Sequence, residues 1–213
     1  MTTLTSNVIR AGVPIDSARA AVVLVHGRGA NAESMLGLAN AFATPDIAYI
    51  APQAPSGSWY PYSFMAPTAR NEPHLGSALD TLTRVVDNLQ QQGIAAERVV
   101  LLGFSQGACL ALEFAARNAQ RFGGVAALSG ALIGPEGTTW TYPGQLAGTP
   151  VFLGCSDVDT HIPLARVHES AEVLRGLGGD VTEIIYPGMG HTIVQDEIYH
   201  VEKLLRGLGA SER

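Results

Sequence analysis

The chain has 213 residues, of which 46% are hydrophobic and 15% are charged, and its formal net charge is −6. This length and composition are typical of a globular domain with a substantial core, so we expect a single domain over residues 1–213. The negative charge argues against nucleic acid or an anionic membrane surface as the main partner.

Two cysteines, Cys109 and Cys155, are too few for a disulfide framework and do not form a metal-ligand cluster. We expect both to be buried free thiols, which is consistent with a reducing, cytoplasmic location.

The first predicted elements are two strands. Residues 6–10 (SNVIR) are a candidate antiparallel edge strand, and the apolar run at 20–25 (AAVVLV) indicates a buried strand. That run is too short to span a membrane, and no cleavage pattern comes after it. We therefore expect no targeting segment and no stable membrane insertion.

Strand and helix signals then alternate along the chain. Apolar runs without period-two alternation are typical of strands covered on both faces, whereas the segment 73–92 repeats its apolar residues with a period near 3.6. The pattern predicts an α/β fold, a mainly parallel central sheet with helices on both faces. Further strands are expected at 47–50, 98–102, 123–128, 150–155 and 181–186, helices at 32–43, 73–92, 106–119, 163–176 and 194–208, and long loops at 51–72 and 129–149.

Residues 103–107 read Gly-Phe-Ser-Gln-Gly between a predicted strand and a predicted helix. This G-x-S-x-G pattern is typical of a nucleophile elbow, a tight turn that presents the serine above the sheet. The glycines remove Cβ atoms that would clash, and the N-terminus of the helix favours negative charge near Ser105. The alternative is an ordinary strand–helix turn, so the interpretation depends on which residues the later strands lead into.

A serine nucleophile in this architecture requires an acid and then a histidine after later strands. The strand at 150–155 is followed by SDVDTHIP, which contains Asp157 and Asp159, and the strand at 181–186 is followed by PGMGHT, which contains His191. Either aspartate satisfies this spacing. The other one is expected to cap the loop by accepting hydrogen bonds from backbone N–H groups.

The other histidines fit the role of base less well. His161 is only two residues from Asp159, His168 and His200 fall within predicted helices, and His74 precedes the serine in the sequence. We therefore predict that His191 is the base.

The strand at 20–25 runs into His-Gly-Arg-Gly-Ala, a turn whose glycines allow backbone N–H groups to face inward. In this architecture an oxyanion hole combines such a loop with the residue after the nucleophile, so the predicted donors are the N–H groups of Arg28 and Gln106. The alternative is a tight turn without a catalytic part. For the Arg28 side chain we consider binding of a substrate carboxylate or an ion pair with Glu33 or Glu72.

Four motifs, GFSQGA, VHGRGA, S-D-x-D-x-x-I-P and GMGH, together resemble the phospholipase/carboxylesterase family of α/β-hydrolases. The resemblance extends from about residue 20 to about residue 205 and keeps the family order. It implies Ser105 as nucleophile and His191 as base, with Arg28 and Gln106 as oxyanion donors. The family's acid stands four residues before the proline, which implies Asp159. Acyl-protein thioesterases of this family look like HGLGD where this chain has HGRGA, and this favours the small bacterial carboxylesterases.

The predicted function is hydrolysis of short- to medium-chain acyl esters, or thioesters, through an acyl-enzyme on Ser105, without metal or cofactor. The alternatives are a lysophospholipase, an acyl-protein thioesterase, or a non-hydrolytic acyltransferase or binding protein. Trp59, Leu132, Ile133 and Met189 are the candidates for the walls of an acyl groove. We expect an open site without a separate lid domain. The resemblance also admits a homodimer, although the sequence indicates no interface.

Overall fold

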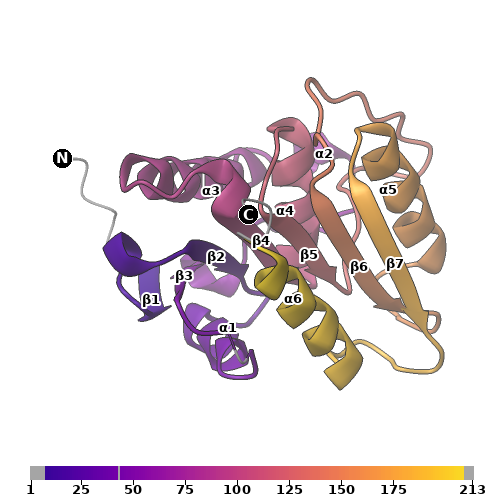
Figure 1. Ribbon diagram of the computed structural model, residues 1–213. Coiled ribbons are helices and arrows are strands. Elements are labelled where there is room, and N and C mark those ends of the chain that lie inside the picture. Colours follow the sequence, from indigo (N-terminus) through magenta and orange to yellow (C-terminus); the bar gives the residue numbers. More distant parts are fainter. Residues whose placement is uncertain (1–7, 43, 209–213) are drawn as a thin grey trace.

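The computed structural model describes residues 8–42 and 44–208 and is built around one seven-stranded sheet (Figure 1). The strands are β1 (Val8–Gly12), β2 (Ala20–Val25), β3 (Ile47–Pro52), β4 (Val99–Phe104), β5 (Gly124–Leu128), β6 (Pro150–Ser156) and β7 (Asp180–Tyr186). The α-helices are α1 (Ala32–Ala39), α2 (Thr68–Asn71), α3 (His74–Gln91), α4 (Gln106–Arg117), α5 (Leu164–Gly176) and α6 (Gln195–Gly207). Three short 3-10 helices are η1 (Ile15–Ser17), η2 (Pro55–Gly57) and η3 (Ala96–Arg98).

The strand order is β1-β3-β2-β4-β5-β6-β7, with β1 antiparallel to β3 and every other pair parallel. After β2 the chain forms β3 on one side of it and then crosses over to form β4 on its other side. The direction in which strands are added to the sheet therefore reverses between β2 and β4. Crevices at such a reversal, beyond the carboxyl ends of the strands, are where open α/β sheets bind ligands. The predicted α/β-hydrolase fold is confirmed.

Hydrophobic cores cover both faces of the sheet. Helices α3, α4 and α5 pack on one face, and α1 and α6 pack on the other (Figure 1). In β4, Leu101 points into the first core while Val100 and Leu102 point into the second. Burial on both sides explains why this strand reads as a continuous apolar run.

The observed elements agree with most of the predicted ones, with two differences. The helix expected over 32–43 ends at Ala39, because the chain turns there and Phe42 stacks on Tyr49 with ring centroids 6.5 Å apart. The loop expected over 51–72 contains η2 and α2. The expected edge strand is observed as β1, while residues 6 and 7 of that prediction lie outside the described residues.

Cys109 and Cys155 are buried and unpaired, as predicted. Burial raises the pKa of both thiols to about 12, so neither is a thiolate near neutral pH. Within residues 8–42 and 44–208, no helix combines the length and apolar character that crossing a membrane requires.

Glu197 in α6 is a fully buried carboxyl group. Its Oε2 accepts a hydrogen bond from the Val194 N–H at 3.0 Å, while its Oε1 has no hydrogen-bond partner among the described residues. Burial raises the pKa of Glu197 to about 7, so the folded protein favours the protonated form. The stability that this group contributes is therefore fully present below its unfolded pKa and is lost as the pH rises through about 7.

We expect Glu197→Gln to be more stable than the wild type by about 3 kcal/mol at about pH 8, and similar to it at about pH 4. Glutamine keeps an acceptor for the Val194 N–H without a buried charge. The measurement is the free energy of unfolding in urea at both pH values. Glu172→Gln, which changes an exposed carboxylate paired with Arg175, is the matched control. A difference in the free energy of unfolding that is the same at both pH values would contradict the raised pKa of Glu197.

Candidate active site

Ser105 lies between the end of β4 and the start of α4, with φ 55° and ψ −121°. This left-handed backbone is strained for a residue with a side chain. A Cβ at Gly103 would come within 2.3 Å of the Gly107 carbonyl oxygen, and a Cβ at Gly107 within 2.0 Å of the Val25 carbonyl oxygen. Both glycines are therefore required by a turn that packs α4 directly against the strands.

His191 connects Ser105 to Asp159. Its Nε2 lies 2.8 Å from the Ser105 Oγ, and its Nδ1 lies 2.7 Å from the Asp159 Oδ2. An ionised carboxylate only accepts hydrogen bonds, so the Nδ1–H donates to Asp159 and Nε2 is left to accept from the serine hydroxyl. The structure thus brings together three predicted residues that come after β4, β6 and β7.

The Asp159 carboxylate is fully buried behind His191. Its Oδ1 accepts hydrogen bonds from the backbone N–H groups of His161 at 2.8 Å and Ile162 at 3.0 Å. Burial by itself would raise the pKa of Asp159, but the hydrogen bonds from His191 and from the two N–H groups outweigh it and hold the pKa below its ordinary value. Asp159 therefore stays ionised beside the imidazole.

Asp157, the other aspartate of this loop, does not contact His191. Its Oδ1 accepts a hydrogen bond from the Gly188 N–H at 2.7 Å, and the neighbouring Ser156 Oγ accepts one from the Gly190 N–H at 3.2 Å. These two bonds tie the loop after β6 to the loop that carries His191. Sequence reasoning assigned a capping role to the second aspartate but gave no role to Ser156.

The loop after β2 passes next to the serine, since a Cβ at Gly27 would lie 3.3 Å from the Ser105 Cβ. The N–H groups of Gly29 and Ala30 bond to the carbonyl oxygens of Gly57 and Gly27. Among the described residues, the N–H groups of Arg28 and Gln106 have no protein acceptor. One unengaged donor on the residue after the serine and another on a loop that passes next to the serine are the arrangement that an oxyanion hole requires.

His26 was not singled out by the sequence reasoning, which treated it only as the end of a strand. Its buried ring donates from Nδ1 to the Gly27 carbonyl at 2.8 Å and accepts at Nε2 from the Ala54 N–H at 3.0 Å. Its carbonyl accepts from the Trp59 indole N–H at 2.8 Å. Burial lowers the pKa of His26, so the ring stays neutral and can accept from Ala54. His26 thereby holds the loop that presents the Arg28 N–H.

The Gln106 side chain also holds a neighbouring loop. Its Nε2 donates to the Tyr60 carbonyl at 2.8 Å, and its Oε1 accepts from the Trp59 N–H at 2.9 Å. Gln106 therefore contributes an unengaged backbone donor beside Ser105 while its amide fixes the segment that continues to the cleft wall.

A cleft of about 430 Å³ opens beside Ser105 and His191. Its apolar walls come from two loops and the last residue of β4, and include Pro61, Tyr62, Phe64, Phe104 and Ile162.

The residues predicted from sequence to line an acyl groove do not line this cleft. Trp59, Leu132 and Ile133 are at most 3% exposed and belong to the core, and Met189 is half-buried outside the cleft lining. The indole of Trp59 turns inward because its N–H bonds to the His26 carbonyl. The groove prediction is corrected accordingly.

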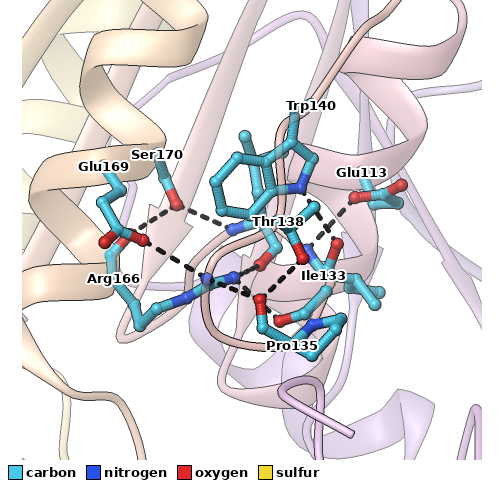
Figure 2. A network of polar contacts seen from close by, with 10 residues as sticks. Glu113, Ile133, Pro135, Thr138, Trp140, Arg166, Glu169 and Ser170 are labelled. Carbon is cyan, nitrogen blue, oxygen red and sulfur yellow. Dashed lines mark hydrogen bonds and ion pairs between the residues drawn. The ribbon is translucent and has the colours of Figure 1, made fainter. Parts of the chain in front are cut away.

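A buried polar network holds the backbone of Leu132 and Ile133 in the core, and Figure 2 shows this network around Ile133. Arg166 donates to the carbonyl oxygens of Leu132 at 2.9 Å and Gly134 at 3.0 Å, and its guanidinium lies 4.6 Å from the Trp140 ring centroid. The Ile133 N–H donates to Glu113 at 3.1 Å. These contacts anchor residues 131–134, the start of the loop over 129–149, in the core, whereas residues 135–145 of the same loop are half-buried or exposed.

Comparisons of this chain with known proteins, by sequence and by structure, find esterases and thioesterases that are similar to it. The family model described as Phospholipase/Carboxylesterase matches residues 7–208. A phospholipase/carboxylesterase structure from Dyadobacter fermentans superposes with a TM-score of 0.91 at 44% identity, covering 97% of this chain and 99% of that one. The acyl-protein thioesterase 1 of Saccharomyces cerevisiae is 25% identical over 94% of this chain and 97% of its own length. That of Gibberella zeae is 36% identical, but the match covers only 62% of this chain and 64% of that protein.

Proposed function

Since the chain belongs to the phospholipase/carboxylesterase family of serine hydrolases, we propose that it hydrolyses short- to medium-chain acyl esters at Ser105. The observation that carries this proposal is the continuous hydrogen-bond chain from Asp159 through His191 to the Ser105 hydroxyl. This order of acceptor, base and nucleophile is the one that acyl transfer to serine requires.

In the proposed reaction the Ser105 Oγ attacks the acyl carbonyl carbon while His191 Nε2 takes the hydroxyl proton. Asp159 holds the ring in the tautomer that can accept this proton and stabilises the imidazolium that results. His191 then gives the proton to the departing alcohol, which leaves the acyl group on the serine. A water molecule, deprotonated by His191, attacks this acyl-enzyme, and His191 returns the proton to the Ser105 oxygen as the carboxylic acid is released.

The tetrahedral intermediates carry a negative oxygen, which we place against the backbone N–H groups of Arg28 and Gln106. Both donors are unengaged within the described part of the chain, and Gln106 is the first residue of α4. One such donor typically lowers the barrier by about 3 kcal/mol. The positive end of the α4 dipole adds to the same effect.

The size of the cleft supports a small acyl group. At about 430 Å³ it lies in the lower part of the range for small-molecule sites, and its walls are largely aromatic and aliphatic. Thioesters react by the same acyl-enzyme route, and the relatives from Saccharomyces cerevisiae and Gibberella zeae are named for that bond. The size of the cleft thus supports a short acyl chain, and it supports no choice between ester and thioester.

We expect kcat/KM for 4-nitrophenyl esters to peak at acyl chains of about four to about eight carbons, because longer chains extend beyond the cleft. The measurement is a series of these esters from acetate to dodecanoate, with the matching thioesters as a second series. An optimum at the longest chains would contradict the chain-length assignment. Absence of hydrolysis throughout both series would contradict the proposed activity itself.

A further inference from the structure

The cleft beside Ser105 differs in charge from the rest of the molecule. The chain as a whole carries a net charge of −6, yet no Asp or Glu is among the residues that line the cleft. Among the residues that the structure describes, Arg28 is the one Lys or Arg residue in this lining. The Asp159 carboxylate lies behind the His191 ring and is fully buried. A ligand in the cleft therefore meets a positive charge without an opposing one.

Arg28 is held in place by neutral groups. Its Nη1 donates to the Ser58 Oγ at 3.1 Å and the Pro61 carbonyl at 2.9 Å, and its Nη2 donates to the Tyr62 carbonyl at 2.7 Å. No carboxylate within the described ranges lies at ion-pair distance from Arg28.

The ion pairs considered from the sequence, with Glu33 or Glu72, are therefore not formed. The Glu72 carboxylate instead accepts from the Gly76 N–H at 3.0 Å. Because the partners of Arg28 are neutral, they hold its guanidinium in place but do not neutralise its positive charge.

The remaining donors of Arg28 suit a carboxylate. A guanidinium has five N–H donors, and three of them bond to the loop over 58–62. The Nε–H and one Nη2–H have no acceptor in the described structure, and Nε and Nη2 form one edge of the planar fork. Such an edge pairs with both oxygens of a carboxylate. Since the loop already holds the guanidinium, little side-chain freedom remains to be lost on binding.

We propose that the Arg28 side chain makes this a site for esters that carry a carboxylate, on either the acyl or the alcohol part. This inference rests on the proposed function and names its substrate class. The Arg28 backbone N–H serves the oxyanion, while the guanidinium of the same residue binds the carboxylate of the substrate beside the reacting carbonyl.

The acyl-side test compares mono-4-nitrophenyl adipate with 4-nitrophenyl hexanoate, which have acyl chains of equal length. The adipate chain is long enough that attack of the terminal carboxylate on its own ester is slow. We expect Arg28→Gln to lower the ratio of kcat/KM for adipate to that for hexanoate by about tenfold or more. Loss of the contacts to the loop over 58–62 affects both esters alike and cancels in the ratio.

The alcohol-side test compares 4-(hexanoyloxy)benzoate with phenyl hexanoate in the same two proteins. A fall of the ratio in one pair of esters only places the carboxylate on that side of the scissile bond. Raised ionic strength should lower kcat/KM for the anionic esters of the wild type more than for the neutral ones.

Two further variants control for folding and for overall charge. Arg28→Lys keeps the charge without the fork and is expected to retain part of the preference. Arg84→Gln removes one positive charge from α3, outside the cleft lining, and should leave both ratios unchanged. Ratios that Arg28→Gln leaves unchanged in both pairs, with the esters still hydrolysed, would overturn the inference alone. Absence of hydrolysis of all four esters by the wild type would overturn the proposed function and this inference with it.

Discussion

Replacement of Ser105 by alanine is expected to lower kcat for 4-nitrophenyl hexanoate by about a million-fold and to abolish labelling by a fluorophosphonate. The residual rate comes from binding and from the oxyanion donors, which the substitution leaves in place. Alanine keeps the Cβ at the strained φ of 55°, so the fold at the turn is preserved. The measurements are steady-state hydrolysis and the intact mass of the protein after exposure to the probe.

Ser129 offers a matched control for this variant. It also has a positive φ, 53°, and its buried hydroxyl has no hydrogen-bond partner among the described residues. Ser129→Ala should keep both labelling and hydrolysis within a few-fold of the wild type, because no base is paired with its hydroxyl. Labelling that persists in Ser105→Ala would place the nucleophile elsewhere, and a folded wild type that is not labelled would contradict a reactive serine altogether.

The second large effect is expected at Asp159. Replacement by asparagine should lower kcat by about ten-thousand-fold. An amide N–H facing His191 Nδ1 favours the tautomer with the proton on Nε2, and that nitrogen then cannot accept the serine proton. The remaining amide oxygen can still accept from the His161 and Ile162 N–H groups, so the loop should stay folded. The measurement is kcat at saturating ester.

Asp157→Asn is the matched control, since it makes the same chemical change two residues away. Asparagine keeps an oxygen that can accept from the Gly188 N–H, so we expect a change of only a few-fold in kcat. Equal losses in the two variants would contradict the assignment of Asp159 as the residue that orients His191.

The sheet and the placement of its loops could be predicted from local patterns. Strand β4 is buried on both faces, which forces an apolar run, and the steric needs of the elbow force glycine at 103 and 107. Parallel strands place their carboxyl ends at one edge, so residues after β4, β6 and β7 were expected to lie near one another.

The choice between the two aspartates shows the limit of spacing arguments. Asp157 and Asp159 both come after β6, and the preference for the second depended partly on the family pattern. In the structure the loop turns so that the Asp159 Oδ2 faces His191 while the Asp157 Oδ1 caps Gly188. The conformation of that loop depends on contacts with the loop after β7, which no local periodicity encodes.

The cleft walls could not be predicted for a related reason. Trp59 and Leu132 were reasonable groove residues by their position on long loops, but an inward hydrogen bond at the first and the Arg166 network at the second bury them. Each of these bonds joins residues more than thirty positions apart in the chain. The hydrogen-bond partners of Arg28 could not be predicted for the same reason. They lie on the loop over 58–62, far from Arg28 in the sequence, and none of them is a glutamate.

The sequence by itself therefore determined the alternating elements, the elbow at Ser105, and the loops on which a base and an acid had to lie. Periodicity and glycine spacing reflect burial and backbone sterics, and both act within a few residues. Only the tertiary structure decided which aspartate faces His191, which side chains line the cleft, and that Arg28 keeps an uncompensated charge. These depend on how loops from distant strands pack and bond to one another, which the local pattern of residues does not specify.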